Sequence, residues 1–453
     1  MSHESDRSSG LFSGIVLVTV GALFLLWTYG GIHLGAVLAH FWPLLLIFWG
    51  LVKIFERTWA QRQGRTAGWI TPGEVFLVIG LIILSGVFVT YEIVKTRIPP
   101  GLMAFGNPFS YDLDVAPKSI PPNAHVEIVT SQGGITVRAA DVPELRVTGQ
   151  KTIRTWNSNE AERLANPVSV AITQDGDTYE IRPTGYDMGD TRFGVSMDVV
   201  VPKHAFVTAR TDHGDISISD MLTDVSVTNR GGDIDISDTT GNVNVDARKG
   251  DIKVSDTKGD VKIANTGSEV GGQIEVINAS GSLSINGEFF GPIRAEKIAK
   301  GVRFLSQRTD LTLNQLTGHM DTGAGDLDIV DAPGNIALRI RSKDVNIENP
   351  TGKVNVENHD AGVSVRFASA PKDDVNIGNT SGEINLSIPA SASFDIQADC
   401  HSCDIDSDFS ADSLKKSKTE NGDSHMEGKY GSGRGPKIIL RTSYGSINIR
   451  KTS

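Results

Sequence analysis

Two cysteines, Cys400 and Cys403, stand in the segment DCHSCD and are the only thiols of the chain. A zinc site would need a second pair of ligands, and a thioredoxin-type redox site would need this spacing at the start of a helix. The flanking segments FDIQAD and DIDSDF read as strands, and His401 lies between the cysteines, whereas a cytochrome attachment site has its histidine after the second one. We therefore expect structural residues, joined by a local disulfide if the domain is exported.

Carboxylates beside a histidine or an arginine are the second group of residues that could do chemistry. Enzymes that cleave polysaccharides on parallel β-helices bring two or three carboxylates, or carboxylates and a basic residue, together on one face. The sets of this kind are His319 with Asp321, Asp326 and Asp328, and Arg308 with Asp310. Acidic residues occur throughout the part of the chain that contains these sets, so almost any short segment of it would yield a similar set. The sequence therefore predicts no catalytic residue and no enzyme.

The ten histidines of the chain are scattered. A zinc protease would carry two of them in an HExxH helix, and no such motif occurs. No glycine-rich phosphate loop opens a helix either, so we predict no metal and no cofactor. Surface positions are expected for His204, His213, His319, His359 and His401.

A unit of nine residues recurs along this chain, as described below. The same period occurs in calcium-binding β-rolls, which repeat glycines and an aspartate as G-G-x-G-x-D so that successive turns form a cage. Here a unit usually has one glycine, and its aspartate leads into the strand, so the oxygen ligands are not doubled across turns. Outward aspartates such as Asp215, Asp233 and Asp251 are expected to form a solvated acidic face that binds cations weakly at most.

A nine-residue repeat must position all of these side chains. Each unit begins with a small or turn-forming residue, usually followed by Asp or Asn, and then alternates apolar and polar residues. Counted on the first inward apolar residue of each unit, 14 of 18 intervals equal nine. The positions counted are Ile216, Val225, Ile234, Val243, Ile252, Val261, Ile274, Leu283, Ile293, Val302, Leu311, Met320, Leu327, Ile336, Val345, Val354, Val363, Val375 and Ile384.

Each unit is one short strand and one turn, which cannot bury its apolar side alone. Residues two apart in a strand share a face, so Ile234 and Ile236 point inward and Asp235 points outward. Stacking two strands per coil, about 18 residues, gives a continuous core between parallel sheets. The sequence predicts an all-β ectodomain, a parallel β-helix or β-solenoid of nine-residue strand-turn units, preceded by three transmembrane helices.

The rest of the ectodomain divides by pattern. A helix is expected in NSNEAERLAN, with Ser158 or Asn157 as its cap. The expected segments are a linker at 99–120, a β-rich lead-in at 121–210 that contains the helix, solenoid repeats at 211–410, an exposed loop at 411–435, and a final strand and cap at 436–453.

The first hundred residues are strongly apolar. After a tail at 1–10, a membrane domain is expected at 11–98, with spans at 11–28, 32–52 and 75–94. Each run is about the 20 residues that a helix needs to cross a bilayer, and the runs lack the polar face of soluble helices. A cleaved signal peptide would have a basic start and one short apolar run, which this segment does not have.

The loop charges predict the orientation. The loop between the second and third spans carries four basic residues against two acidic ones, and YGGIH between the first two spans carries no Lys or Arg. The positive-inside bias puts the basic loop in the cytoplasm and everything after the third span outside the bacterial plasma (inner) membrane, although Lys95 and Arg97 count against this. The net charge of −11 excludes a nucleic-acid partner, because such a protein needs a basic surface to neutralise phosphates.

Two segments carry family resemblances. GIVLVTVGALFLLW followed by FWPLLLIFWGLVKIFE, about residues 11–56, resembles the LiaI/LiaF-like transmembrane region of bacterial envelope-stress proteins. VVVPKHAFVTARTDHGDISIS, GEINLSIPASASFDIQAD and IILRTSYGSINIRK carry a resemblance, over about 124–450, to the bacterial putative-adhesin β-solenoid domain of unknown function. CHSCDIDSDF departs from that family's turn pattern by adding the two thiols.

Two hypotheses on function follow. The first is a non-enzymatic, membrane-anchored rod that binds or scaffolds envelope polysaccharide or membrane and surface proteins, with its binding face among the outward polar residues of 214–263. The alternative is a regulator or sensor in envelope-stress signalling, whose membrane helices pair with partner proteins through small residues such as Gly14 and Gly21, or Gly80 and Gly86. A polysaccharide-acting β-helix enzyme is a lesser alternative.

Overall fold

The computed structural model describes residues 106–265 and 272–452, which fall in the unit Phe105–Ser453. The expected tail, the three expected membrane spans and the start of the expected linker lie outside the described residues. Within the described ranges, no helix is both long enough and apolar enough to cross a bilayer.

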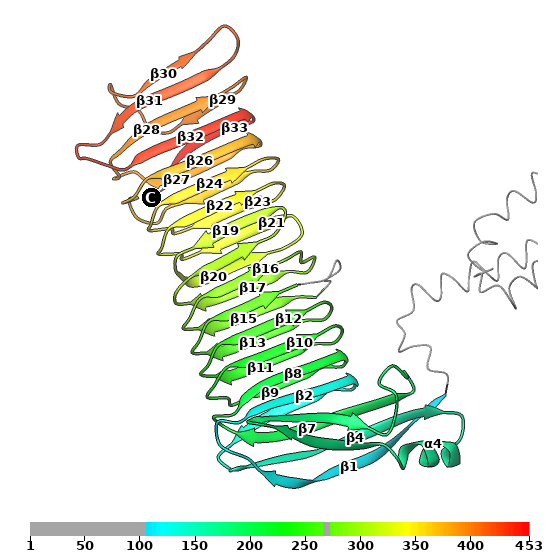
Figure 1. Cartoon of the computed structure of the whole chain (residues 1–453). Helices are drawn as coiled ribbons and strands as arrows, with labels where there is room; N and C mark the ends of the chain where they lie inside the picture. Colours follow the sequence, from blue (N-terminus) through cyan, green and yellow to red (C-terminus); the bar gives the residue numbers. More distant parts are fainter. Residues whose placement is uncertain (1–105, 266–271, 453) are drawn as a thin grey trace, which may run out of the picture. The chain divides into compact units, whose positions relative to one another are not determined.

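Two long sheets face each other along a stack of coils (Figure 1). The first sheet runs, in spatial order, through β1 (Asn107–Ser119), β4 (Glu144–Thr155), β7 (Phe193–Pro202), β3 (Ile135–Ala140), β9 (Ile216–Ser219), β11 (Ile234–Thr239), β13 (Ile252–Thr257), β15 (Ile274–Ala279), β17 (Ile293–Ile298), β20 (Leu316–Thr322), β21 (Asp326–Val330), β23 (Asp344–Glu348), β25 (Val363–Arg366), β27 (Ile384–Pro389), β33 (Ser446–Thr452) and β29 (Asp404–Ser407).

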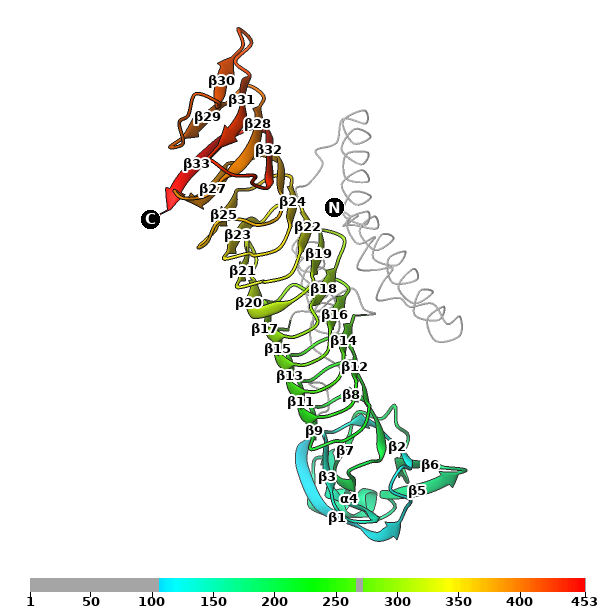
Figure 2. The same cartoon turned by 90° about the vertical axis from the view of Figure 1, so that its left-hand side faces the viewer.

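The second sheet covers the opposite side of each coil (Figure 2). Its pairings run through β5 (Ser169–Asp175), β6 (Thr178–Thr184), β2 (His125–Gln132), β8 (Phe206–His213), β10 (Val225–Asn229), β12 (Val243–Ala247), β14 (Val261–Ala264), β16 (Leu283–Asn286), β18 (Val302–Leu305), β19 (Thr309–Leu313), β22 (Ile336–Ile340), β24 (Val354–Asn358), β26 (Val375–Ser381), β32 (Lys437–Tyr444), β28 (Phe394–Cys400), β31 (Ser424–Tyr430) and β30 (Lys415–Lys418).

The regular coils have the register that the repeat predicts. Val225 pairs with Val243 and Ile234 with Ile252, both in parallel and both 18 residues apart. Every inward position counted in the repeat is at most 2% exposed. Burying one such aliphatic side chain is worth about 2 kcal/mol before entropy is subtracted. Because every coil buries such residues, the stabilisation is spread along the stack. The prediction of an all-β solenoid of stacked coils is confirmed.

One coil runs backwards, which the parallel prediction missed. β18 turns directly into β19 and pairs with it in antiparallel fashion, and β20 is antiparallel to both β17 and β21. The chain thus reverses its direction around the stack at 306–308 and restores it at 323–325. Leu311 and Met320 still point inward, fully buried, because alternation within a strand is the same in either direction. The nine-residue count therefore could not reveal the reversal.

The lead-in begins earlier than expected. β1 starts at Asn107 and pairs in antiparallel fashion with β4, so much of the expected linker 99–120 is a strand. The helix α4 (Ser158–Ala165) has Asn157 as its N-cap, whose side chain accepts a hydrogen bond from the Glu160 backbone N–H. Of the two caps left open by the sequence, the structure selects Asn157.

The C-terminal end of the stack differs most from expectation. Residues 411–435, expected as an exposed loop, contain the antiparallel hairpin β30–β31, in which Ser424 and Met426 are buried. The last segment, expected as the cap, does not lie at the end of the stack. β32 inserts between β26 and β28, and β33 between β27 and β29 (Figure 1). The coil of β28 and β29, with the hairpin, is the terminal one.

Candidate functional site

The outward aspartates of the regular coils have a structural role. Asp215 Oδ1 accepts a hydrogen bond from the backbone N–H of Asp233 at 2.9 Å, and Asp233 Oδ1 accepts one from Asp251 at 2.8 Å. A second ladder uses Asp224, whose carboxylate accepts from the Asn242 N–H at 2.7 Å. Each side chain at a coil boundary thus joins its coil to the next, and one carboxylate oxygen is occupied by a backbone donor.

Removing one carboxylate of this ladder tests its structural role. We expect Asp233→Ala to destabilise the neighbouring coils by about 1 kcal/mol, because the Asp251 N–H loses its acceptor. Asp233→Asn keeps an acceptor oxygen and should be close to neutral. Hydrogen exchange of the Asp251 amide measures the difference, and equal protection in both variants would contradict the ladder.

The structure brings part of the first carboxylate set together. Asp321 and Asp328 lie opposite each other on β20 and β21, and His319 Nε2 is 3.7 Å from Asp321. Asp328 accepts a hydrogen bond from Asn346, while Asp326 accepts one from the Gly323 N–H in the turn. This set lies on the open face of the first sheet.

The second set does not form. Asp310 pairs with Arg303 instead of Arg308, which is exposed in the β18–β19 turn. Within the described ranges, no group of three His, Cys, Asp or Glu side chains is placed to hold a metal ion.

Cys400 and Cys403 lie at the end of β28 and in the turn after it. The structure joins them in a disulfide with their Cα atoms 5.4 Å apart. Cys400 is only 2% exposed, and its side chain packs into the core of the terminal coil. Cys400 lines the groove described next.

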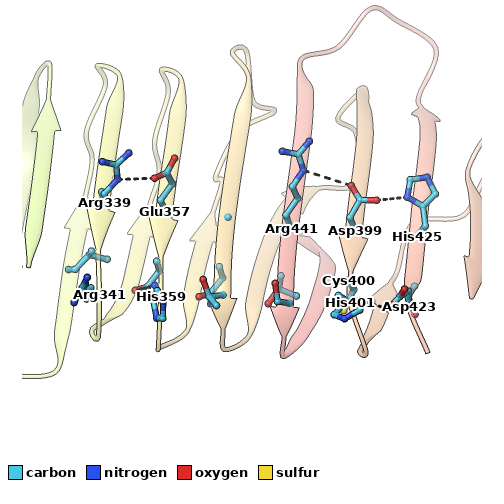
Figure 3. A pocket seen from close by; sticks show the side chains of 18 residues that line it. Arg339, Arg341, Glu357, His359, Asp399, Cys400, His401, Asp423, His425 and Arg441 are labelled. Carbon is cyan, nitrogen blue, oxygen red and sulfur yellow. Dashed lines mark hydrogen bonds and ion pairs between the residues drawn. The ribbon is translucent and has the colours of Figure 1, made fainter. Parts of the chain in front are cut away.

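A groove of about 710 Å³ crosses the outer face of the second sheet at its C-terminal end. It spans six neighbouring strands, β22, β24, β26, β32, β28 and β31, whose order in space differs from their order in the sequence. Two rows of outward side chains line it, one residue from each strand in each row (Figure 3). We call it the charged groove.

The upper row is defined by strand register. It consists of Arg339, Glu357, Gly378, Arg441, Asp399 and His425. Its carboxylates are paired: Arg339 Nε donates to Glu357 at 2.9 Å, and His425 Nδ1 lies 2.6 Å from Asp399, which also has Arg441 Nε at 3.9 Å.

The lower row lies two residues from the upper row, on the same strands or just beyond their ends. It consists of Arg341, His359, Thr380, Ser443, His401 and Asp423. His401 Nδ1 is 2.6 Å from Asp423, and His359 Nδ1 is 2.8 Å from Asp360. Arg341 is exposed and forms no ion pair with any residue of the described ranges.

The bare centre of the groove is at Gly378. A Cβ atom built there would meet only the Val356 carbonyl oxygen, at 4.0 Å, and the residue does not have a positive φ. The fold therefore does not require glycine at this position. Glycine inside a strand weakens it, and it often marks a place where another molecule approaches the backbone.

The pKa of His425 is shifted by its neighbours in the groove. The hydrogen bond to Asp399 raises the pKa of His425 above its ordinary value of 6.5, with a smaller contribution from Glu427, and partial burial opposes the shift. The protonated imidazole thus stabilises the pairing of β28 with β31.

The sign of the resulting pH dependence follows from linkage. Because the folded pKa is raised, the stabilisation is complete below the ordinary pKa and disappears as the pH rises through the folded value. We expect the melting temperature of the wild type to exceed that of His425→Gln at pH 5.5 by more than at pH 8.5. His359 and His401 are common to both proteins and cancel in the difference. A gap that widens with pH would contradict this assignment.

The nine-residue repeat did not predict this groove. It suggested a binding face among residues 214–263, in the most regular coils, and the groove lies elsewhere, at 339–443. His359 and His401 were named only as surface residues, and both now line it. The missing information is the insertion of β32 next to β26, which brings Arg441 beside Gly378.

Solved structures with low similarity include a "putative cell adhesion protein" from Clostridium sporogenes, 8% identical over 76% of this chain and 100% of that chain, with a TM-score of 0.19. A "putative adhesin" from Parabacteroides distasonis is 10% identical over 76% of this chain and 97% of its own, with a TM-score of 0.23. One from Bacteroides fragilis has the same identity and coverage, with a TM-score of 0.18.

No curated protein matches the chain. The LiaF transmembrane domain family matches residues 12–109, which extends past the resemblance seen at 11–56. The Toastrack DUF4097 family matches residues 261–450, from β14 to β33. The match includes the reversed coil, the inserted C-terminal coil and the whole charged groove. The chain therefore combines a segment that matches the LiaF transmembrane domain family with a segment that matches the Toastrack DUF4097 family.

Proposed function

We propose that this protein is a non-enzymatic, membrane-anchored scaffold whose β-solenoid lies outside the plasma membrane and binds an envelope or surface component. The observation that carries the proposal is the charged groove, a long polar surface formed by six strands. Its acidic side chains Glu357, Asp399 and Asp423 each have a basic partner, which suits the recognition of a polar partner better than acid–base catalysis.

The membrane arrangement is part of the proposal. We infer spans at 11–28, 32–52 and 75–94, with the N-terminus in the cytoplasm and the solenoid outside. The LiaF transmembrane family match and the basic loop between the second and third spans support it. The solenoid would then present its outer faces to the envelope from a fixed base.

Protease treatment of intact spheroplasts tests the location. With a tag placed after Ser453, we expect the tag to be lost without lysis. An isolated envelope fraction should also retain the purified full-length chain. Protection of the tag until lysis would put the solenoid in the cytoplasm and overturn the proposal, as would the absence of any binding to the envelope fraction.

The cysteine pair provides an independent test of the compartment. Disulfides persist in oxidising environments, so we expect Cys400 and Cys403 to resist alkylation in protein taken directly from cells and to react after reduction. Closing so short a loop contributes about 2 kcal/mol, and Cys403→Ser should loosen the turn between β28 and β29 by a similar amount. Mass spectrometry after alkylation measures the first effect, and two free thiols in untreated protein would contradict it.

A regulatory role in envelope-stress signalling is the second candidate, and the LiaF transmembrane domain match is the observation that favours it. In that case the membrane helices would bind a partner membrane protein. Crosslinking in cells with and without envelope stress distinguishes the two roles. A stress-dependent membrane partner that persists when the solenoid is deleted would favour regulation.

A further inference from the structure

The lower row of the charged groove presents a hydrogen-bond donor on, or just past the end of, each of five neighbouring strands. Arg341 offers its guanidinium, Thr380 and Ser443 offer hydroxyls, and His359 and His401 offer imidazoles. Neighbouring strands are about 4.8 Å apart, so this run of donors extends over about 20 Å. A ligand that uses all of it must be extended and rich in acceptors.

The charges of the groove favour an anionic ligand. The three carboxylates of the groove already have basic partners. Glu357 pairs with Arg339, Asp399 with His425 and Arg441, and Asp423 with His401. Arg341 is left as a cation without an ion-pair partner among the described residues. A guanidinium in this situation binds a carboxylate or a phosphate in a charge-assisted, bidentate manner.

The shape of the groove favours a chain over a folded surface. Gly378 leaves the middle of the upper row empty although a side chain would fit there. Glu357 and Arg441 flank this gap on the neighbouring strands (Figure 3). Next to Ser443 of the lining, Tyr444 is 63% exposed, and its ring lies edge-on to that of His401, with centroids 6.4 Å apart. An exposed aromatic ring beside donors can contact the apolar face of a sugar ring while the donors bind its hydroxyls and acidic groups.

We infer that the charged groove binds an acidic polysaccharide, lying across strands β22 to β31 with its acidic groups toward Arg341 and its backbone over Gly378. The inference rests on the proposed binding function and specifies its site and its ligand class. The lower row provides the contacts, and the gap at Gly378 provides the room.

The test measures binding of the full-length chain in nanodiscs of zwitterionic lipid to polygalacturonate, with dextran as the neutral control. We expect binding to polygalacturonate that weakens with salt, and none to dextran. Arg341→Ala should weaken binding about tenfold, and Gly378→Trp should abolish it by filling the groove. The matched controls are Arg210→Ala and Thr208→Trp, both on outward exposed positions of β8, and neither should change the affinity.

The outcomes separate this inference from the proposed function. Equal affinity of Gly378→Trp and wild type, or equal binding of dextran, would overturn the groove assignment. Equal binding of poly-glutamate would overturn the polysaccharide class. Arg341→Ala is a surface change and keeps the test valid if Gly378→Trp fails to fold. Retention of the Gly378→Trp variant on the envelope fraction at wild-type level would refute the groove while leaving the binding function intact.

Discussion

Gly250→Ala is expected to unfold the coils around it, while Gly378→Ala should leave the protein as stable as the wild type or slightly more so. Gly250 has a φ of +109°, and a Cβ atom there would lie 2.0 Å from the Gly232 carbonyl oxygen. Strained backbone and overpacking together cost about 3–5 kcal/mol. At Gly378 neither problem exists, and replacing glycine by alanine inside a strand gains about 0.5 kcal/mol.

Hydrogen exchange of the full-length chain, peptide by peptide, measures both effects. In a solenoid each coil contacts only its neighbours, so the damage from Gly250→Ala should be local and centred on β11 to β14. Gly378→Ala serves as the matched control for the loss of a glycine. If both variants behaved alike, the tight approach of the glycine backbones at the coil boundaries would not determine stability.

The sequence predicted the regular part of the fold because the repeat is local. Alternation identified inward residues such as Ile234, and the period fixed the pairing of neighbouring coils 18 residues apart. The reversed coil was missed because Leu311 and Met320 keep the same inward pattern in either direction. The ladder role of Asp233 was also missed, because its partner is a backbone N–H one coil away.

The groove could not be found from the repeat alone, because it depends on which coils become neighbours. One signal in the sequence does point to the insertion. INL at 384–386 and INI at 447–449 repeat the same phrase, and the structure pairs Asn385 with Asn448, whose side chains are joined by a hydrogen bond of 3.0 Å. Reading this match as adjacency would have placed β33 beside β27, and with it β32 beside β26.

The inserted coil has a large predicted effect of its own. Deleting residues 436–453 removes β32 and β33, each of which is paired on both sides. β28 would lose its pairing with β32, and β29 its pairing with β33. In the core, Val375 and Ile384 would lose their paired neighbours Ile438 and Ile447. We expect loss of hydrogen-exchange protection from β26 through β31, together with loss of ligand binding at the groove.

A pair of point variants separates the inserted coil from the terminal one. Ile449, fully buried on β33, has neighbouring strands on both sides, whereas Ile405 lies on β29 at the edge of the first sheet. Ile449→Asp should expose β27, β33 and β29, because a carboxylate buried without a partner is not tolerated, and Ile405→Asp should expose only the terminal coil and its hairpin. If β28 kept its hydrogen-exchange protection after deletion of residues 436–453, β28 would have to pair directly with β26, and the inserted coil would be dispensable. The expected result instead makes residues 436–453 those that complete the groove, because β32 supplies Arg441 and Ser443 to its lining and joins β26 to β28.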